Sequence, residues 1–499
     1  MQELYKFLTA KCKERGVKIE SLTERFNFTC SRTTIYRYMK GLLHITQDVQ
    51  DRFVDLLSLS GEEQAQFARL ISLSVFDETL LAARQKIDKF LFEPKINSGA
   101  TREIECVFYD GDKYIRTISE IFSMIYDLSK HDDFRCDVKI IGCTQEDMLA
   151  YASDFAQTLL SLSPSSQVEH LVTLFETDFL QSTVFLLTVL PLLVRGAYKV
   201  YYRESAAGEG VKTLFGNSIL IPCQYTEDGA LRKRCYILSF LDKDMPECIV
   251  NDDKYVLGFW MKNYTNLRQY YPDVLTHSAL SMTEDDLSTL ESAYDEYLIK
   301  PNPCYNKIPM SAYRSLVSRA SPDDLMRFAS NMVRRDVRDD AETRAVLEPM
   351  LLDLEKRVGH TYKRRHIDVY SKEGLAEFAE TGRITDHLEG LPPFDKEEIR
   401  EILTWLRDRN RDPKDPYTLY LVDSLQHRYS FVIYKGRGLL VECSQSLAEK
   451  GTYVYLDIRN RNLLKVFCDY IENHLPVNYT LSTEETTAFI DELIGKNCS

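Results

Sequence analysis

The chain of 499 residues is too long to fold around one hydrophobic core, so several domains are expected. Hydrophobic residues make up 44% of the chain and its formal net charge is -14, which is typical of a soluble globular protein and argues against one that coats nucleic acid over its whole surface. The most apolar run, Thr183 to Val194, contains Pro191 and is shorter than the roughly 20 residues that cross a bilayer. We therefore expect a buried core segment there and no contact with a membrane.

The cysteines and the N-terminus indicate a cytoplasmic protein. The twelve cysteines include no Cys-x-x-Cys pair, and the chain opens with Met-Gln-Glu-Leu-Tyr rather than with a secretory signal. Reduced thiols are therefore expected. Neither Cys nor His has the spacing of zinc ligands, and no glycine-rich phosphate-binding stretch is present, so the sequence predicts no metal site and no cofactor.

Charge is distributed unevenly along the chain. Residues 1–46 contain nine basic and four acidic side chains, a charge of +5, which leaves -19 for the rest of the total of -14. A small basic head on an acidic body is typical of a protein that contacts an anionic partner at one end only.

The basic head is predicted to consist of short helices. Apolar residues at helical spacing indicate a first helix that ends at Gly16, a second over residues 20–26, a third over residues 31–40 and a fourth that begins after Thr46. Ser60, with Glu63 three residues later, has the pattern of a capping box and opens a fifth. Five short helices, the third of them cationic, follow the helix-turn-helix plan.

The third helix carries the residues most informative about function. Ile35, Tyr38 and Met39 recur at i, i+3 and i+4 and give it an apolar face. Its first turn presents hydroxyl and guanidinium groups, which contact phosphates and base edges when a helix enters the major groove of DNA. The expected contacts to base edges or phosphates come from Arg32, Thr33, Thr34, Tyr36 and Arg37, with Ser31 as N-cap and Ser31 and Lys40 on the DNA backbone.

A family resemblance supports this interpretation. Thr34-Ile-Tyr-Arg-Tyr-Met-Lys-Gly, followed by a helix and a Leu-Ser-Gly-Glu-Glu segment, resembles the Xre or Cro repressor type of helix-turn-helix over roughly residues 1–72. Asn27 stands in the turn where that family usually has Gly, and Asn tolerates the left-handed backbone of such turns. The resemblance implies a head that binds double-stranded DNA. The alternative is an ordinary helix whose charged face is only solvated.

The rest of the chain alternates between strand-like and helical patterns, which predicts an α/β (α+β) body. Two helix starts within it are marked by caps, at Ser371 and Asp395. The fold class expected is thus multidomain, with an all-α helix-turn-helix head and a large α/β body. Its segments are a helix-turn-helix domain at 1–75, a linker helix at 76–100, a central α/β domain at 101–280, a helical connector at 281–360 and a C-terminal α/β domain at 361–499.

Two helices of the body share a pattern. Leu257, Trp260, Met261 and Tyr264 lie at i, i+3, i+4 and i+7 after a strand and a polar turn, and the helix that starts near Asn462 repeats this spacing after another strand and turn. The simpler interpretation, which we prefer, is that any amphipathic helix that packs on a sheet looks like this. The other is that the body contains two similar lobes with a ligand cleft between them.

Three motifs suggest chemistry but have simpler explanations. Asp110-Gly-Asp resembles a phosphotransferase loop, but Tyr114 stands where that family has Thr or Val, so a turn is expected. Lys435-Gly-Arg-Gly is best interpreted as a hairpin turn, with a phosphate-binding nest as the alternative. Lys363-Arg-Arg-His is a basic run that could bind an anion, although a solvated run is the commoner case.

Together these observations predict a sequence-specific DNA-binding transcriptional regulator and not an enzyme. Its body is expected to form a homodimer and to sense a small molecule or a protein effector. The alternative is an enzyme, or a protein-interaction module, that carries a helical targeting head.

Overall fold

The computed structural model forms two compact units, residues 1–85 and residues 86–499, and each is described by itself. The helix α6 (Glu78–Phe92) contains the boundary between them. The residues that the structure describes are 2–18, 32–39, 47–61, 63, 64, 66, 67, 70, 78–93, 104–163, 166–175, 178–194, 196–205, 216–240, 245–278, 284–304, 307–333, 336–384, 390–426, 429–443 and 454–497.

The first unit packs three described helices, α1 (Gln2–Glu14), α3 (Arg32–Met39) and α4 (Gln47–Leu57), around one apolar core. The second predicted helix, residues 20–26, and the turn after it lie outside the described residues. The predicted capping box is confirmed, since the backbone N–H of Ser60 donates to Glu63 Oε2 at 2.8 Å and that of Glu63 to Ser60 Oγ at 3.4 Å. The buried core residues of this unit are Leu4, Phe7, Leu8, Cys12, Ile35, Met39, Val49, Phe53, Leu57, Leu59, Phe67 and Leu70.

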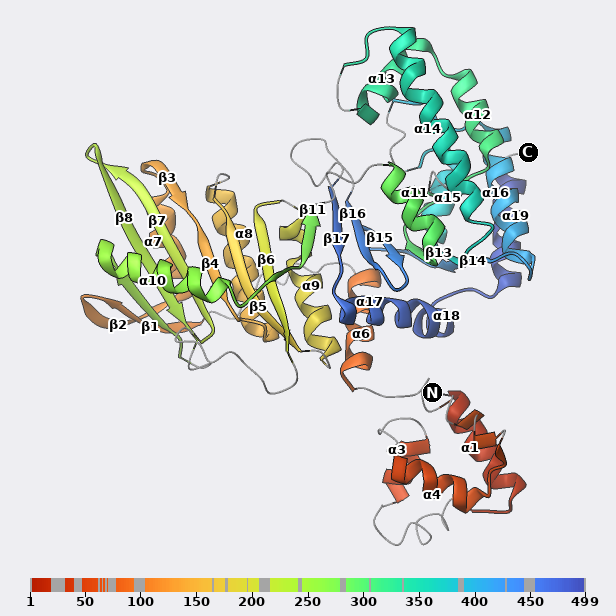
Figure 1. The fold of residues 1–499 in the computed structure, drawn as a ribbon, viewed down its shortest axis with the longest axis horizontal. Helices are drawn as coiled ribbons and strands as arrows, with labels where there is room; N and C mark the ends of the chain where they lie inside the picture. Colours follow the sequence, from red (N-terminus) through yellow and green to blue (C-terminus); the bar gives the residue numbers. More distant parts are fainter. Residues whose placement is uncertain are drawn as a thin grey trace. The chain divides into compact units, whose positions relative to one another are not determined.

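The second unit has the mixed α/β architecture that the sequence predicts, and it contains two sheets (Figure 1). We call the first sheet and its helices lobe A; its strand order is β10-β6-β5-β4-β7-β8-β9-β1-β2, with β3 paired to β7. Its strands are β1 (Glu105–Asp110), β2 (Asp112–Thr117), β3 (Asp132–Cys136), β4 (Val138–Ile141), β5 (Val168–Phe175), β6 (Tyr198–Ser205), β7 (Ser218–Glu227), β8 (Ala230–Ser239), β9 (Glu247–Asn251) and β10 (Asp273–Val274).

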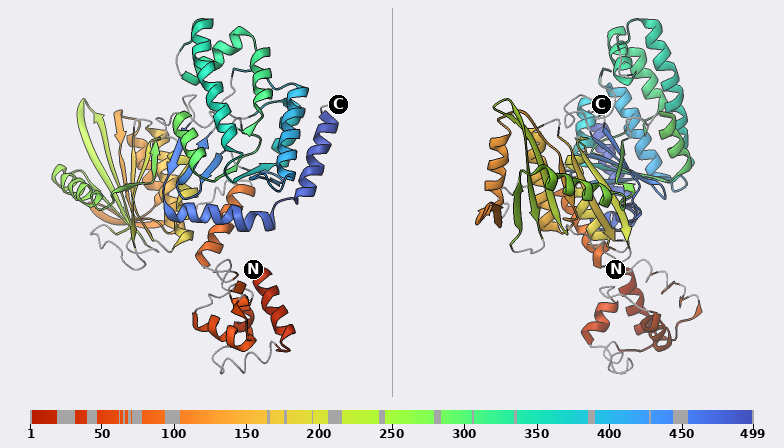
Figure 2. Two further views of the ribbon diagram at one scale, coloured as in Figure 1. Left: turned by 45° about the vertical axis from the view of Figure 1, so that its right-hand side comes forward. Right: turned by 60° about the vertical axis from the view of Figure 1, so that its left-hand side comes forward.

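Helices cover lobe A's sheet unequally on its two faces (Figure 2). On one face lie α7 (Ile118–Leu128), α8 (Glu146–Leu162) and α9 (Phe179–Leu193); on the other lies α10 (Lys254–Arg268). Successive strand residues point to opposite faces. Accordingly, the ring of His170 lies 5.2 Å from that of Phe185 on α9, whereas Leu171 packs in the cluster that contains α10. The apolar run predicted to be a core segment falls largely within α9 and is mostly buried.

Lobe B is built on the second sheet, whose strand order is β11-β17-β16-β15-β12-β13-β14. Its strands are β11 (Thr276–Ser278), β12 (Glu296–Ile299), β13 (His366–Ser371), β14 (Tyr417–Val422), β15 (Tyr429–Tyr434), β16 (Gly438–Cys443) and β17 (Val454–Ile458). The sequence does not predict β12, which lies within the predicted helical connector. Its four residues are too few to give a strand pattern.

The helices of lobe B include those that the sequence marks by caps. Ser371 Oγ accepts from the backbone N–H of Gly374 at 3.0 Å, and Asp395 forms a full capping box. The helices are α11 (Glu284–Ala293), α12 (Met310–Arg319), α13 (Pro322–Val333), α14 (Asp340–His360), α15 (Lys372–Thr381), α16 (Lys396–Arg411), α17 (Arg461–Asp469), the π-helix η4 (Tyr470–His474), α18 (Leu475–Asn478) and α19 (Thr483–Asn497).

The two lobes share one strand topology. In lobe A, β4, β5 and β6 are parallel, β7 runs antiparallel to β4, and β7, β8 and β9 form a meander. In lobe B, β12, β13 and β14 are parallel, β15 runs antiparallel to β12, and β15, β16 and β17 form a meander. A helix follows each meander: α10, capped by Asp253, and α17, capped by Asn460. The shared helix spacing seen in the sequence therefore belongs to a repeated topology.

Candidate functional site

The helix predicted to contact DNA is α3, and the side chains that dock it are placed as expected. Ile35 and Met39 are fully buried in the core of the first unit, and Tyr38 packs against that core while partly exposed. Tyr36 is also partly exposed. Arg32, Thr33, Thr34 and Arg37 are on the described backbone of α3, but their side chains lie outside what the structure describes, as do Ser31 and Lys40 entirely.

Some of the head's basic residues have partners inside the head. Lys11 Nζ lies 2.8 Å from Glu63 Oε1 and 2.7 Å from Glu14 Oε2, and Arg15 Nη2 lies 3.2 Å from Glu63 Oε2. The hydrogen bond from Lys11 lowers the pKa of Glu63 to about 2, with help from the backbone N–H of Ser60. These two cations therefore link α1 to the segment that Ser60 opens, and they add less to an external anion-binding face.

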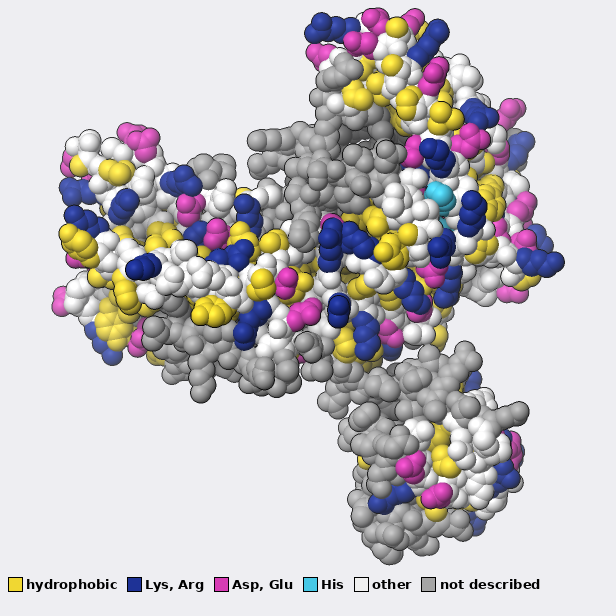
Figure 3. Space-filling model, viewed as in Figure 1, with side chains coloured by type: hydrophobic (Ala, Val, Ile, Leu, Met, Phe, Trp, Pro, Cys, Tyr) yellow, Lys and Arg dark blue, Asp and Glu magenta, His cyan; other side chains and the backbone are white. Residues whose placement is uncertain are grey.

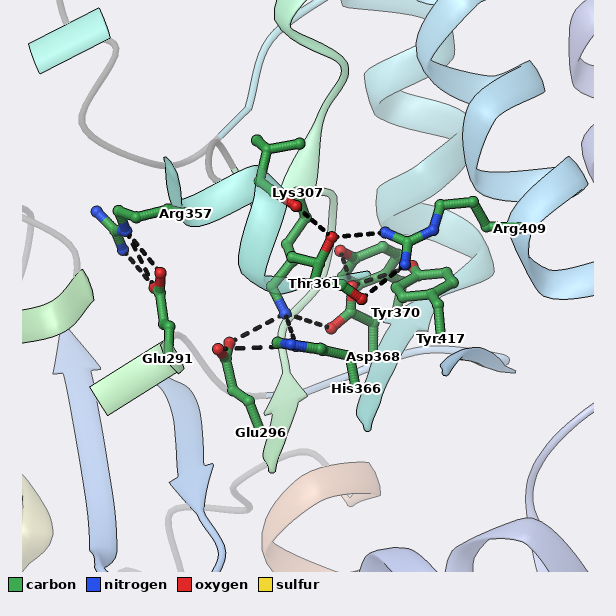
Figure 4. A network of polar contacts seen from close by, with 11 residues as sticks. Glu291, Glu296, Lys307, Arg357, Thr361, His366, Asp368, Tyr370, Arg409 and Tyr417 are labelled. Carbon is green, nitrogen blue, oxygen red and sulfur yellow. Dashed lines mark hydrogen bonds and ion pairs between the residues drawn. The ribbon is translucent and has the colours of Figure 1, made fainter. Parts of the chain in front are cut away.

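The most concentrated polar chemistry of the described residues lies in lobe B, on β12, β13 and β14 (Figure 4). At its centre is Lys307, which follows β12. Its Nζ lies 2.9 Å from His366 Nδ1, 3.0 Å from Glu296 Oε1 and 3.4 Å from Asp368 Oδ1. The second oxygen of Asp368 accepts from two tyrosine hydroxyls, Tyr370 at 2.7 Å and Tyr417 at 3.0 Å. We call these six residues the Lys307 network.

Burial sets the protonation states of the Lys307 network. It raises the pKa of Glu296 to about 7, since the charged form is desolvated and Oε2 accepts no hydrogen bond from the described residues. Burial opposes the charge of Lys307 as well, but Asp368 and Glu296 together outweigh it and raise the lysine pKa above its ordinary value. Burial and the charge of Lys307 hold the pKa of His366 well below 6.5. A neutral His366 thus accepts from the ammonium, and Asp368 is its main counter-charge.

Two arginine sites flank the network. Arg409 on α16 donates to both oxygens of Asp415 at 2.6 and 2.8 Å and to Thr361 Oγ1 and O at 2.8 Å. Its guanidinium also lies 4.1 Å from the Tyr362 ring centroid. Arg357 on α14 forms a bidentate pair with Glu291 on α11, at 2.7 and 2.9 Å. Each pair is buried and joins two segments of lobe B.

The Lys307 network is arranged for structure and not for reaction with a substrate. The side chains of Lys307, Glu296 and Asp368 are 3% exposed or less, so an external molecule has no direct access to the reactive atoms. The network instead ties β12, β13 and β14 to the chain after β12. No spacing in the sequence predicted this network, although the Asp inside the apolar strand Ile367-Asp-Val-Tyr was a signal that could have indicated it.

The motifs with simpler explanations are structural turns or paired charges. Asp110 pairs with Asp112 across the β1–β2 turn, where Gly111 has φ +77°, and Gly436 with φ +87° turns the β15–β16 hairpin. In that hairpin Lys435 pairs with Glu472, and Arg437 with Asp457. From the basic run, Arg364 donates to the carbonyl of Ser292 and Arg365 pairs with Glu472. The turn interpretations are confirmed.

Within the described ranges, no group of three or more His, Cys, Asp or Glu side chains is placed to hold a metal ion. Nor do these ranges contain a helix with the length and apolar character that crossing a membrane requires. Every cysteine side chain described is buried and outside any disulfide. No protein-family model matches the chain, and a search of curated proteins finds no match.

Proposed function

We propose that this protein is a sequence-specific DNA-binding transcriptional regulator whose head contacts the major groove through α3. The observation that supports this proposal most strongly is the way α3 packs in the core of the head. Ile35 and Met39, one helical turn apart, are fully buried in the head's core. On an ideal helix, positions 33 and 37 lie on the side opposite to them. The residues at these positions are a threonine and an arginine, which suit phosphate and base-edge contact.

The division of the chain supports the same proposal. The head belongs to a compact unit of its own, residues 1–85, and its residues 1–46 carry a net charge of +5, while the acidic body forms the other unit. An acidic body is repelled by phosphates, so DNA contact would be confined to the head. In this proposal Arg32, Thr33, Thr34, Tyr36 and Arg37 contact base edges or phosphates, and Ser31 and Lys40 contact the backbone.

The body would supply dimerisation and regulation. A dimer places two heads on half-sites one helical turn apart, about 34 Å on B-DNA, and a small molecule or protein partner that favours one arrangement of the body changes that spacing. Any such effector must bind elsewhere than the buried Lys307 network.

The test uses the full chain and the duplex that it retains from a random pool. Fluorescence anisotropy compares wild type with the double variant Arg32→Ala/Arg37→Ala. Because a bidentate base contact discriminates by about 1–3 kcal/mol, loss of two contacts should weaken binding roughly 30-fold or more. Circular dichroism should be unchanged, since the variant keeps Ile35 and Met39, the residues by which α3 packs in the core of the head.

The matched control is Lys6→Ala/Lys13→Ala, which also removes two positive charges, but from exposed positions of α1. It should lose much less affinity and keep its sequence preference. Equal losses in both variants, or none in the first, would contradict a recognition role for α3. A protein-interaction module is separated by salt, since DNA affinity falls by about 0.9 log unit per phosphate contact for each tenfold rise in salt. An enzyme is separated by assaying turnover of nucleotides and phosphoesters.

A further inference from the structure

The outer face of α10 carries large apolar side chains that are exposed to solvent. Leu257, Tyr264 and Leu267 anchor the helix in the apolar cluster on lobe A's sheet. On the opposite side, Tyr255 is 77% exposed and Phe259 is 59% exposed. They lie one turn apart on the same stripe. Figure 3 is drawn from the side on which α10 lies in front of the sheet, and it shows hydrophobic side chains at this end of lobe A.

The apolar surface continues on the sheet beside the helix. Ile249 on β9 pairs directly with Ile237 on β8, and Ile237 packs in the cluster beneath α10, so both face the α10 side. Leu231 lies an even number of residues before Ile237 and shares that face. Ile115 on β2 shares it too, because it pairs with Val107, which pairs with Glu247, two residues before Ile249. Ile249, Leu231 and Ile115 are 38, 58 and 52% exposed.

The repeated topology shows what such a helix face does elsewhere in the chain. When the N-caps Asp253 and Asn460 are aligned, positions 255 and 258 of α10 match Asn462 and Lys465 of α17. Asn462 donates to the carbonyl of Phe175 at 2.8 Å, and Lys465 Nζ lies 4.7 Å from the ring centroid of Phe179. In lobe B this face is therefore the contact with lobe A. In lobe A the equivalent face is uncovered within the described chain.

We infer that the outer face of α10 is a docking surface for a second copy of this chain, with the two α10 helices antiparallel about a two-fold axis. Four of the exposed positions of α10, 255, 258, 259 and 262, lie along this face, and their spacing of three, one and three residues is the same in both directions. An antiparallel pair centred between 258 and 259 therefore sets Tyr255 opposite Lys262 of the second copy, and Gly258 opposite its Phe259. Each contact occurs twice, as two-fold symmetry requires.

These pairings are chemically complementary. A Cβ atom built on Gly258 meets nothing within 4 Å, so the helix backbone is open there to the close approach of a phenyl ring. Lys262 is exposed, and its ammonium can lie over the ring of Tyr255. That ring has one cation near it already, since Lys254 Nζ lies 5.1 Å from its centroid, and most of the tyrosine is still exposed. The helix pair would form the centre of an interface whose margin is the apolar sheet surface.

This inference rests on the proposed function only because that function explains why the chain would dimerise. The test of the dimer itself involves no DNA. Sedimentation velocity of the full chain measures self-association directly. Phe259→Asp should raise the dimer dissociation constant at least about tenfold, because it puts a carboxylate at the centre of the contact. The control is Tyr126→Asp, at a tyrosine of α7 that is 50% exposed on the other face of the same sheet, and it should stay dimeric.

A charge swap tests the antiparallel pairing. Tyr255→Lys alone puts two ammonium groups opposite each other and should weaken the dimer, whereas Tyr255→Lys/Lys262→Tyr restores each aromatic–cation pair and should recover it. A wild-type chain that stays monomeric up to about 100 µM, where a dimer with a Kd of 10 µM would form, overturns the inference. The inference is also overturned if Phe259→Asp leaves the dimer dissociation constant unchanged, or if the double variant Tyr255→Lys/Lys262→Tyr dimerises more weakly than Tyr255→Lys alone. If DNA binding failed and these results held, the interface would stand.

Discussion

Replacing Lys307 by Met tests whether one buried ammonium holds lobe B together. The substitution keeps the length and the apolar stem of the side chain, so it creates little cavity. It removes the cation that lies 3.4 Å from Asp368 Oδ1 and 3.0 Å from Glu296 Oε1. Asp368 would keep its two tyrosine donors but lose its counter-charge.

The size of the effect follows from these distances. At an effective dielectric constant of about 20, the attraction between Lys307 and Asp368 at 3.4 Å is about 5 kcal/mol. The variant no longer has to desolvate an ammonium, which returns part of this energy. Breaking a buried pair by removing one partner destabilises proteins by about 3–5 kcal/mol, and we expect the same range here. Glu296→Gln should cost less than about 1 kcal/mol at pH 7, because burial raises the pKa of Glu296 to about 7 and the carboxyl is already half protonated.

The assay is denaturant unfolding followed by tryptophan fluorescence. The chain has two tryptophans, Trp260 on α10 and Trp405 on α16. In a Trp260→Phe background the signal reports lobe B alone, since the indole of Trp405 donates to Tyr362 and lies 4.8 Å from the guanidinium of Arg409. If Lys307→Met cost under about 1 kcal/mol, or no more than Glu296→Gln, the ammonium would not be neutralising a buried charge and our electrostatic account would be wrong.

Three further predictions use the same kind of measurement. Because the pKa of Glu296 is raised from 4.5 to about 7, the free energy of unfolding of wild type should fall by on the order of 3 kcal/mol relative to that of Glu296→Gln as pH rises from 4.5 to 7. A difference between the two proteins that does not change with pH would contradict this. Burial lowers the pKa of His170 from 6.5 to about 4, so the free energy of unfolding of lobe A should fall by on the order of 3 kcal/mol as pH falls from 6.5 to 4. The fluorescence of Trp260 in a Trp405→Phe background measures this, and His170→Gln should not show the same pH dependence. Gly374→Ala should destabilise lobe B by about 3 kcal/mol or more, because its Cβ would lie 2.2 Å from the carbonyl oxygen of Pro301; a thermal melt equal to wild type would refute the close approach.

The sequence predicted well those elements whose signals are local. The caps at Ser371 and Asp395 are hydrogen bonds within three residues, and both are present as expected. The apolar run that falls mostly within α9 is buried, as its composition indicated. These features depend on neighbours in the chain, so one sequence contains enough information to place them.

Features that depend on distant contacts were not predicted. β12 is a strand because β13 and β15 pair with it on either side, and neither is near it in the sequence. The Lys307 network joins residues from three strands and a connecting segment, so no spacing rule marks it. The repeated topology was present in the sequence only as a shared helix spacing, which any helix packed on a sheet would give. Strand order and direction, which only the structure supplies, distinguish the two interpretations.

The most direct test of the central claim is to ask whether the full wild-type chain selects a sequence from a pool of random DNA duplexes. We predict enrichment of one motif made of two half-sites whose centres are about one helical turn apart, with the preference lost in Arg32→Ala/Arg37→Ala. A pool that stays random after repeated selection at moderate salt, although the chain is folded, would contradict the assignment of the head to DNA recognition.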